Sequence, residues 1–236
     1  MVRESRIIAN LLLLGASDKD WVRVIQDNNE LQKRTPATAK RFAQSIRKRL
    51  ELLEPEFWKA LRDGDDELAT QVAFVSVLER NLLLLEFMES AVKDAYAGHV
   101  MKIELYQWAD FLEDCGNKDP KIYAWKDSTK YKMGTVVFRI LFEAGYLESA
   151  RTPKLQNVLI RPEIKDMLEN KKLIEVNLDV VFVVINLYEN NNNAITIGAI
   201  YILSFSSLSV LLEEVSVVFN VLFVDFAAWI AKFTIS

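Results

Sequence analysis

The stretch LATQVAFVSVLERNLLLLEFMESAVKDAY, from Leu68 to Tyr96, decides the fold class. Its apolar side chains recur at spacings of three and four residues: Val72, Val75, Leu78, Leu82, Leu85 and Met88. Side chains at these spacings line one face of an α-helix. The stretch therefore predicts a core helix or a broken pair of helices.

Helix signals continue on the N-terminal side of this stretch. Seven glycines and five prolines leave little material for hairpin turns in a chain of 236 residues. A first helix is predicted from Ser5 to Leu14 and is closed by Gly15. Ser17 is a good N-cap for a second helix, with Asp20 at the capping-box position, and Thr35-Pro36 starts a third helix that runs to about Leu53.

The C-terminal side predicts a helix over Leu105–Leu112, a helix over Met133–Ala144 stopped by Gly145, and a short strand over Leu155–Ile160. Pro162 opens a further helix. We therefore expect an all-α helical bundle with a small winged-helix-like C-terminal module and a hydrophobic tail. The predicted domains are residues 1–117 for the helical bundle, 118–175 for the basic winged-helix-like module and 176–236 for the tail.

Charge and cysteine content restrict the class of protein. Of 29 basic and 33 acidic residues, only Lys232, Glu189, Glu213, Glu214 and Asp225 lie beyond residue 180, so the preceding part is almost neutral. The single cysteine, Cys115, excludes an intrachain disulfide and suits a reducing cytoplasm. The apolar run Leu11–Leu14 is too short for a signal peptide, so we expect a cytoplasmic protein.

Sequence motifs of common enzymes are missing. The chain has no GxxxxGK[ST], GxGxxG, HExxH or GxSxG motif, so we expect no enzymatic activity, no cofactor and no metal. The acidic residues Asp63, Asp65, Asp66 and Glu67 invite a magnesium site, but a turn followed by an N-cap explains them better. Cys115 is expected to be structural, because the one histidine, His99, is not near it in sequence.

The helix that starts at Thr35 is the best candidate for binding a nucleic acid. From Lys33 to Arg49 there are seven basic residues and no acidic one. A helical projection points Phe42, Ile46, Leu50 and Leu53 to the core. It places two cationic rows on the opposite face with a glutamine between them, and the candidate contacts are Lys33, Arg34, Lys40, Arg41, Gln44, Arg47 and Lys48. The alternative is a solvated face whose charges pair with Glu51 and Glu54.

A second basic group lies around the predicted winged-helix-like module, interleaved with Tyr123, Trp125 and Tyr131. Its candidate DNA contacts are Lys130, Lys132, Arg151 and Lys154. Arg139 lies among apolar residues and is expected to pair with an internal carboxylate instead.

The tail permits several interpretations. The uncharged run Ala194–Leu212 is close to the ~20 residues that cross a bilayer. The next apolar run, Val215–Phe233, contains Asn220 and Asp225, and a mid-membrane Asp costs about 2.5–3.5 kcal/mol. The alternatives are a membrane hairpin over residues 194–233, a tail that packs onto the preceding part of the chain, and a tail that is not typical of related proteins.

Two blocks of sequence resemble the BrxA family of bacteriophage-exclusion (BREX) proteins. They are RESRIIANLLLLGASDKDWVRVIQDNNELQKRTPATAKRFAQSIRKRL, Arg3 to Leu50, and VFRILFEAGYLESARTPKLQNVLIRPEI, Val137 to Ile164. The resemblance covers roughly residues 1 to 175 and does not include Val180–Ser236.

The resemblance implies a helical bundle similar to the antitermination protein NusB, double-stranded DNA binding and action alongside other BREX proteins. It favours binding over the solvated-face interpretation of the basic helix. Because proteins of this kind have also been catalogued as inner-membrane proteins, a membrane-associated scaffold is one alternative function, and RNA binding of the NusB type is the other.

Overall fold

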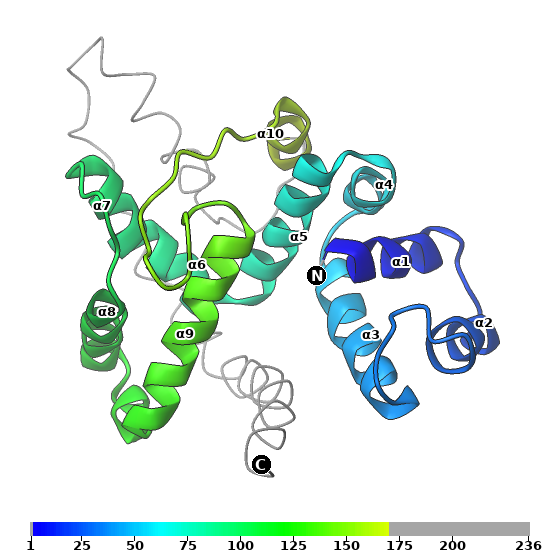
Figure 1. The fold of residues 1–236 in the computed structure, drawn as a ribbon, viewed down its shortest axis with the longest axis horizontal. Coiled ribbons are helices and arrows are strands. Elements are labelled where there is room, and N and C mark those ends of the chain that lie inside the picture. The colour runs from blue at the N-terminus through cyan, green and yellow to red at the C-terminus, as the bar shows by residue number, and fades with distance from the viewer. Residues whose placement is uncertain (1, 170–236) are drawn as a thin grey trace.

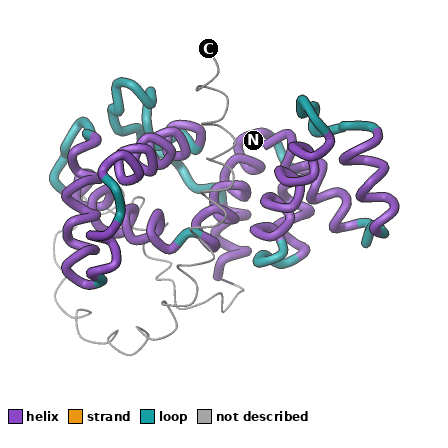
Figure 2. Tube along the Cα trace, turned by 90° about the horizontal axis from the view of Figure 1, so that it is seen from below, coloured by secondary structure: helices purple, strands orange, loops and turns teal. Residues whose placement is uncertain are grey.

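The computed structural model describes residues 2–169. The predicted tail domain 176–236, the end of the 118–175 module and the membrane hairpin over 194–233 lie outside the described residues. Within residues 2–169 every regular element is a helix, as Figure 2 shows, and this confirms the predicted all-α class.

The first helices begin where local signals place them. They are α1 (Val2–Leu13), α2 (Asp18–Val22), the π-turn η1 (Arg23–Asp27), α3 (Pro36–Leu50) and α4 (Pro55–Asp63). Ser17 caps α2 in a capping box with Asp20, and Thr35 caps α3 ahead of Pro36. The third helix ends at Leu50 rather than Leu53, because the residue before Pro55 is held in extended conformation and α4 starts at that proline.

The apolar stretch that decides the fold is a broken pair of helices. It forms α5 (Asp66–Arg80), then α6 (Leu82–Phe87), the π-turn η2 (Met88–Val92) and α7 (Lys93–Ala97). Asn81 makes the break: it leaves helical conformation at φ −123° and ψ 81°, and its side chain accepts from the Leu84 N–H. The two parts bend by 107°.

Two of the remaining helices are longer than their apolar patterns indicate, whereas the last begins at Pro162 as predicted. The remaining helices are α8 (Leu105–Lys118), the 3₁₀ turn η3 (Pro120–Ala124), α9 (Asp127–Glu143) and α10 (Pro162–Glu169). The predicted start of α9 at Met133 is six residues late, because its first turns are polar and carry no apolar period. Gly145 ends this part of the chain as predicted, with φ +86°, a value that favours glycine.

The strand predicted over Leu155–Ile160 is wrong. Residues 2–169 contain only isolated antiparallel bridges, Leu147 with Leu155 and Lys102 with Lys154. Backbone groups beyond Leu155 form hydrogen bonds with a side chain rather than with a strand. The Gln71 side chain of α5 donates to the Leu159 carbonyl at 2.8 Å and accepts from the Arg161 N–H at 2.9 Å.

Two clusters of buried residues hold the helices together, and Figure 1 shows α5 between the helices that form them. The N-terminal cluster joins α1, α3, α4 and α10 to one side of α5, with Ile8, Phe57, Val72 and Ile164 buried. The second cluster joins the other side and end of α5 to α6–α9. Neither cluster ends at residue 117, and α10 packs in the N-terminal one. Helix α5 contributes residues to both clusters. Whether the chain divides into separately folding domains at residues 117 and 118 stays a prediction.

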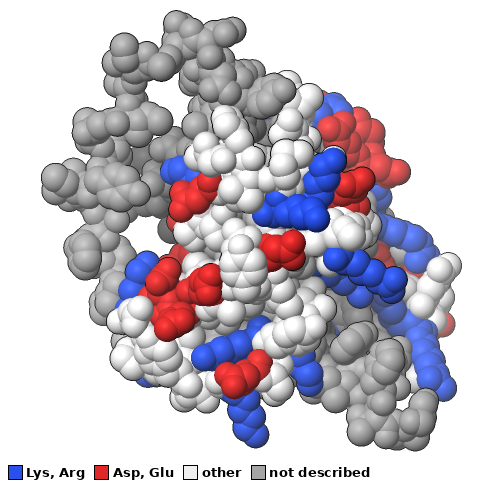
Figure 3. Space-filling view, turned by 60° about the vertical axis from the view of Figure 1, so that its left-hand side comes forward, with Lys and Arg blue, Asp and Glu red and all other residues white. Residues whose placement is uncertain are grey.

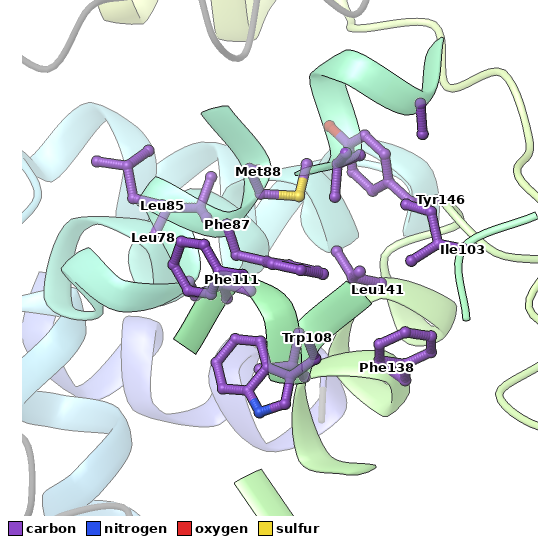
Figure 4. Packing of buried hydrophobic residues seen from close by; sticks show 14 of the residues in the cluster. Leu78, Leu85, Phe87, Met88, Ile103, Trp108, Phe111, Phe138, Leu141 and Tyr146 are labelled. Atoms are coloured by element: carbon purple, nitrogen blue, oxygen red, sulfur yellow. The ribbon is translucent and has the colours of Figure 1, made fainter. Parts of the chain in front are cut away.

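Aromatic rings fill the second cluster (Figure 4). Phe87 is completely buried and lies 5.2 Å from the Trp108 ring and 5.3 Å from Phe111, centroid to centroid. Burying one such side chain contributes about 1.5–3 kcal/mol. Gly134 of α9 lies so close to α8 that a Cβ there would stand 2.6 Å from Cδ1 of Trp108. This contact sets the spacing between α8 and α9.

Among residues 2–169, no single helix combines the length and the apolar character of a membrane span. Only the bent pair Asp66–Arg80 and Leu82–Ala97 meets both criteria when its two members are taken together. Both members contribute buried side chains to the cores described above.

Candidate nucleic-acid interface

The face of α3 that points away from the core is polar and basic. Ile46 and Leu50 are buried as predicted, whereas Lys40, Gln44 and Lys48 are exposed at spacings of four residues. No ionic partner contacts Lys40 or Lys48 within residues 2–169. The amide and the two ammonium groups therefore form a single exposed row along the helix.

The two arginines that flank this row are half-buried. Arg47 donates from Nε to Glu51 at 2.6 Å and lies over the Trp21 ring at 4.7 Å. The Nε atom of Arg41 is buried without a hydrogen-bond partner within the part of the chain that the structure describes. The exposed surface is therefore narrower than two full cationic rows, and Lys40, Gln44 and Lys48 form its centre.

Lys33 and Arg34, which precede α3, differ in their surroundings. Lys33 donates from Nζ to Glu4 of α1 at 2.7 Å, with both side chains mostly covered, and lies 4.6 Å from the Phe42 ring centroid. Burial of Glu4 raises the pKa of its carboxyl group. The hydrogen bond and the positive charge of Lys33 act in the opposite direction, and the net shift of the pKa is downward. Lys33 thus joins α1 to the start of α3, while Arg34 is exposed.

The second basic group separates into a covered part and an exposed part. Lys130 and Lys132 on α9 are half-buried, and Nζ of Lys130 lies 5.9 Å from the Tyr123 ring centroid. Arg151 and Lys154 are exposed after the end of α9. The expected internal partner of Arg139 is wrong: its side chain is 68 % exposed and pairs with Glu143 on the same helix at 2.9 Å.

Arg161 does not belong to the exposed basic surface. It pairs with Asp65 at the start of α5 and with Glu163, at 2.8 Å in each case. These hydrogen bonds raise the pKa of Arg161. The guanidinium therefore fixes the segment before α10 against α5.

Lys102 is a basic residue that sequence reasoning missed. An antiparallel bridge places it directly opposite Lys154, and both lysines are exposed. The two residues are 52 positions apart in the sequence, and no local pattern indicates their pairing.

The acidic segment and the cysteine have structural partners. Asp65 caps α5 by accepting from the Leu68 N–H at 2.8 Å, as the turn-plus-cap interpretation predicts. Asp66 accepts from Arg6 at 3.0 Å, and Asp63 accepts from Arg62 at 2.7 Å. Burial raises the pKa of the Cys115 thiol to about 12, and Glu86 adds to the shift. The sulfur is therefore a thiol at neutral pH.

Figure 3 shows one face of the molecule, on which Lys and Arg side chains alternate with Asp and Glu. Among the described residues drawn there, the two signs are mixed. Attraction of a polyanion to this face therefore depends on local groups of cations more than on a field of one sign.

Comparison with known proteins identifies the relatives of this chain. The family model BrxA matches residues 1–172. The BREX protein BrxA of Paramagnetospirillum magneticum is 39% identical over 165 residues, covering 70% of this chain and 83% of that protein. The BREX protein BrxA of Escherichia coli is 32% identical over 169 residues, covering 72% and 79%.

A solved structure agrees with these matches. The crystal structure of an uncharacterized protein from Magnetospirillum magneticum superposes with a TM-score of 0.65 at 33% sequence identity, covering 78% of this chain and 92% of that one. The family model spans every described residue of the basic surface. The chain belongs to the BrxA family of BREX phage-defence proteins.

Proposed function

We propose that this chain binds double-stranded DNA without catalysing a reaction, as an accessory component of a BREX system. The observation that carries the proposal is the exposed row Lys40, Gln44 and Lys48 on α3, in which neither lysine has an ionic partner within residues 2–169. Family membership supports a role in phage defence and suggests other BREX proteins as partners.

The row suits the sugar–phosphate backbone of a duplex. Residues four positions apart lie about 6 Å apart along a helix, so the row presents two ammonium groups separated by an amide donor. Lysine is a flexible point charge that adapts to phosphates. Phosphate contacts position a protein on DNA but carry no sequence information. The α3 surface is therefore expected to bind all duplexes alike.

Two features support the absence of catalysis. Cys115 holds its proton at neutral pH, and only the thiolate is nucleophilic. The carboxylates of Asp63, Asp65 and Asp66 accept from a helix N-terminus or from arginines rather than converging on a common point. We expect no nuclease, ATPase or methyltransferase activity from the isolated chain.

Fluorescence anisotropy with labelled DNA and RNA duplexes of the same sequence tests the proposal. Lys40→Glu/Lys48→Glu should weaken DNA binding on the order of ten- to hundredfold at 0.1 M salt, because two phosphate contacts are lost. Lys59→Glu/Lys118→Glu changes two exposed lysines elsewhere by the same net charge and should weaken it much less. Equal loss in both variants would assign the effect to net charge alone. Tighter binding of the RNA duplex would favour RNA as the ligand.

A further inference from the structure

Residues 101–103 form the outermost of three short extended segments that lie side by side after α7 and α9. The Leu155 N–H donates to the Met101 carbonyl and the Ile103 N–H to the Pro153 carbonyl, both at 3.0 Å. On its other side the segment 153–156 exchanges two hydrogen bonds with residues 146–148, both at 2.9 Å. Within residues 2–169, the middle segment is therefore paired on both sides and the segment 101–103 on one side only.

The backbone of Lys102 faces away from the middle segment. Because Met101 and Ile103 bond to that segment, the N–H and C=O of the residue between them point to the opposite side. Neither group has a hydrogen bond to any of residues 2–169, and Lys102 is exposed. In Figure 1 the link from α7 to α8 runs along the margin of the described chain. Lys102 thus presents a free donor and a free acceptor, which are the groups that a further strand pairs with.

This edge is fixed by its neighbours in the chain. His99 takes φ +52° at the end of α7, and the Val100 N–H closes that helix by donating to the Ala95 carbonyl at 2.8 Å. Ile103 is completely buried in the second cluster. The extended backbone at Lys102 is therefore held on both sides, and a partner that pairs with it has little ordering to impose on this chain.

Charged side chains form a row across the three segments. Glu148, Lys154 and Lys102 lie opposite one another in successive segments, and all three are exposed. Like charges directly opposite each other destabilise a strand pair, and neither ammonium has an ionic partner within residues 2–169. Glu148 offsets the charge at one end of the row, whereas Glu104, the next acid after Lys102, belongs to the capping box of α8. A carboxylate beyond Lys102 would place an acid at each end of the row.

The other face of the edge is apolar. Side chains alternate between the two faces of an extended segment, so Met101 lies on the face opposite to Lys102, beside the buried Ile103. Met101 is 65% exposed. In a segment added next to Lys102, the residues before and after the one opposite Lys102 would lie on this apolar face. Methionine adapts its shape to the side chain that it meets.

We propose that the edge 101–103 binds an extended segment of a partner protein, in which an acidic residue opposite Lys102 has apolar neighbours. That residue exchanges both backbone hydrogen bonds with Lys102, and its carboxylate offsets the repulsion between Lys102 and Lys154. Membership of the BrxA family suggests other BREX proteins as partners, which favours a protein segment as the occupant. The proposal goes beyond the binding of DNA by α3 and uses none of the residues assigned to that surface.

Selection from a phage-displayed library of random linear peptides, with the full chain as target, tests the proposal. The enriched sequences should share an acidic residue between apolar ones. Anisotropy with a labelled peptide of that sequence then measures the variants. Lys102→Glu/Lys154→Glu should weaken its binding about tenfold or more, and a lysine at the acidic position of the peptide should restore it. Lys59→Glu/Lys118→Glu is the control of equal charge and should change it little.

Methylation of the peptide backbone tests the pairing itself. N-methylation of the acidic residue removes the donor to the Lys102 carbonyl and should weaken binding about tenfold or more. N-methylation of the next residue, whose N–H points away from the edge, should weaken it much less. Equal effects of the two methylations would overturn the pairing of backbones.

Three further outcomes would overturn the proposal. The first is a library without an enriched acidic motif, or a motif whose binding survives Lys102→Glu/Lys154→Glu. The second is weaker duplex binding in that variant without an enriched peptide, which would assign the lysine pair to DNA. The third is self-association that the variant loses in analytical ultracentrifugation, which would assign the edge to a second copy of the chain. Circular dichroism and thermal melting establish that each variant is folded.

Discussion

Gln71 of α5 accepts from the backbone N–H of Arg161, ninety positions later in the chain, at 2.9 Å. The same side chain donates from Nε2 to the Leu159 carbonyl at 2.8 Å. Gln71 is 6% exposed. Its side-chain amide supplies the hydrogen bonds that a neighbouring strand would have given to these two backbone groups. One side chain on the helix shared by both clusters thus fixes the path of the chain toward α10.

Replacing Gln71 by leucine should therefore destabilise the protein. The substitution removes two part-buried hydrogen bonds, each of which contributes about 0.5–1.5 kcal/mol. The free energy of unfolding, measured by urea denaturation, should fall by an amount in that range. Gln44→Leu, at an exposed position on α3, should leave it almost unchanged. Equal effects at the two positions would contradict the role given to Gln71.

The ion pairs of Arg161 should make stability depend on pH. The Leu68 N–H and Arg161 lower the pKa of Asp65, and hydrogen bonds from Arg161 lower the pKa of Glu163. A carboxyl with a lowered pKa in the folded state stabilises the fold above its unfolded pKa of about 4, and this stabilisation is lost as pH falls through the folded value.

Arg161→Gln should therefore be less stable than the parent chain at pH 7, with a difference that shrinks between about pH 5 and pH 2.5. Urea denaturation at several pH values measures it. Arg34→Gln, at an exposed arginine outside the ion pairs described here, should differ from the parent by an amount that does not change with pH. A constant difference for Arg161→Gln would show that its ion pairs do not stabilise the fold.

The features that could be predicted from the sequence depend on residues close together in the chain. Ser17 and Thr35-Pro36 start helices through contacts within four residues, and the structure has both caps. The periodicity from Val72 to Met88 suits a continuous helix and a broken pair equally, so only the conformation of Asn81 decides between them. The candidate contacts on α3 could be placed on one face in the same way, because a helix fixes the direction of each side chain.

The features that could not be predicted from the sequence depend on contacts between residues far apart in the chain. Lys33 belongs to the same basic run as Lys40, yet its ammonium pairs with Glu4 on another helix. Arg161 is fixed by Asp65, and Lys102 meets Lys154 across a bridge. None of these contacts leaves a signal in the neighbouring sequence. A basic residue can therefore be assigned to a surface only when the long-range contacts are known.

The chemistry of Cys115 gives a simple test of the core. Because burial raises the pKa of its thiol to about 12, almost no thiolate is present at pH 8. A disulfide reagent such as DTNB should react very slowly with the folded chain and rapidly after unfolding in guanidinium chloride. Rapid reaction of the folded protein would mean that the contacts between α8 and η2 open readily.

The central claim, that the exposed row on α3 binds the DNA backbone, is tested most directly by the salt dependence of binding. If about six phosphates are neutralised, the affinity for a duplex should fall roughly 10³-fold between 50 and 200 mM salt. Lys40→Glu/Lys48→Glu should reduce the slope of log affinity against log salt concentration by the amount expected for about two phosphate contacts. It should weaken the binding of every duplex sequence equally. Unchanged affinity and slope in this folded variant would contradict the claim.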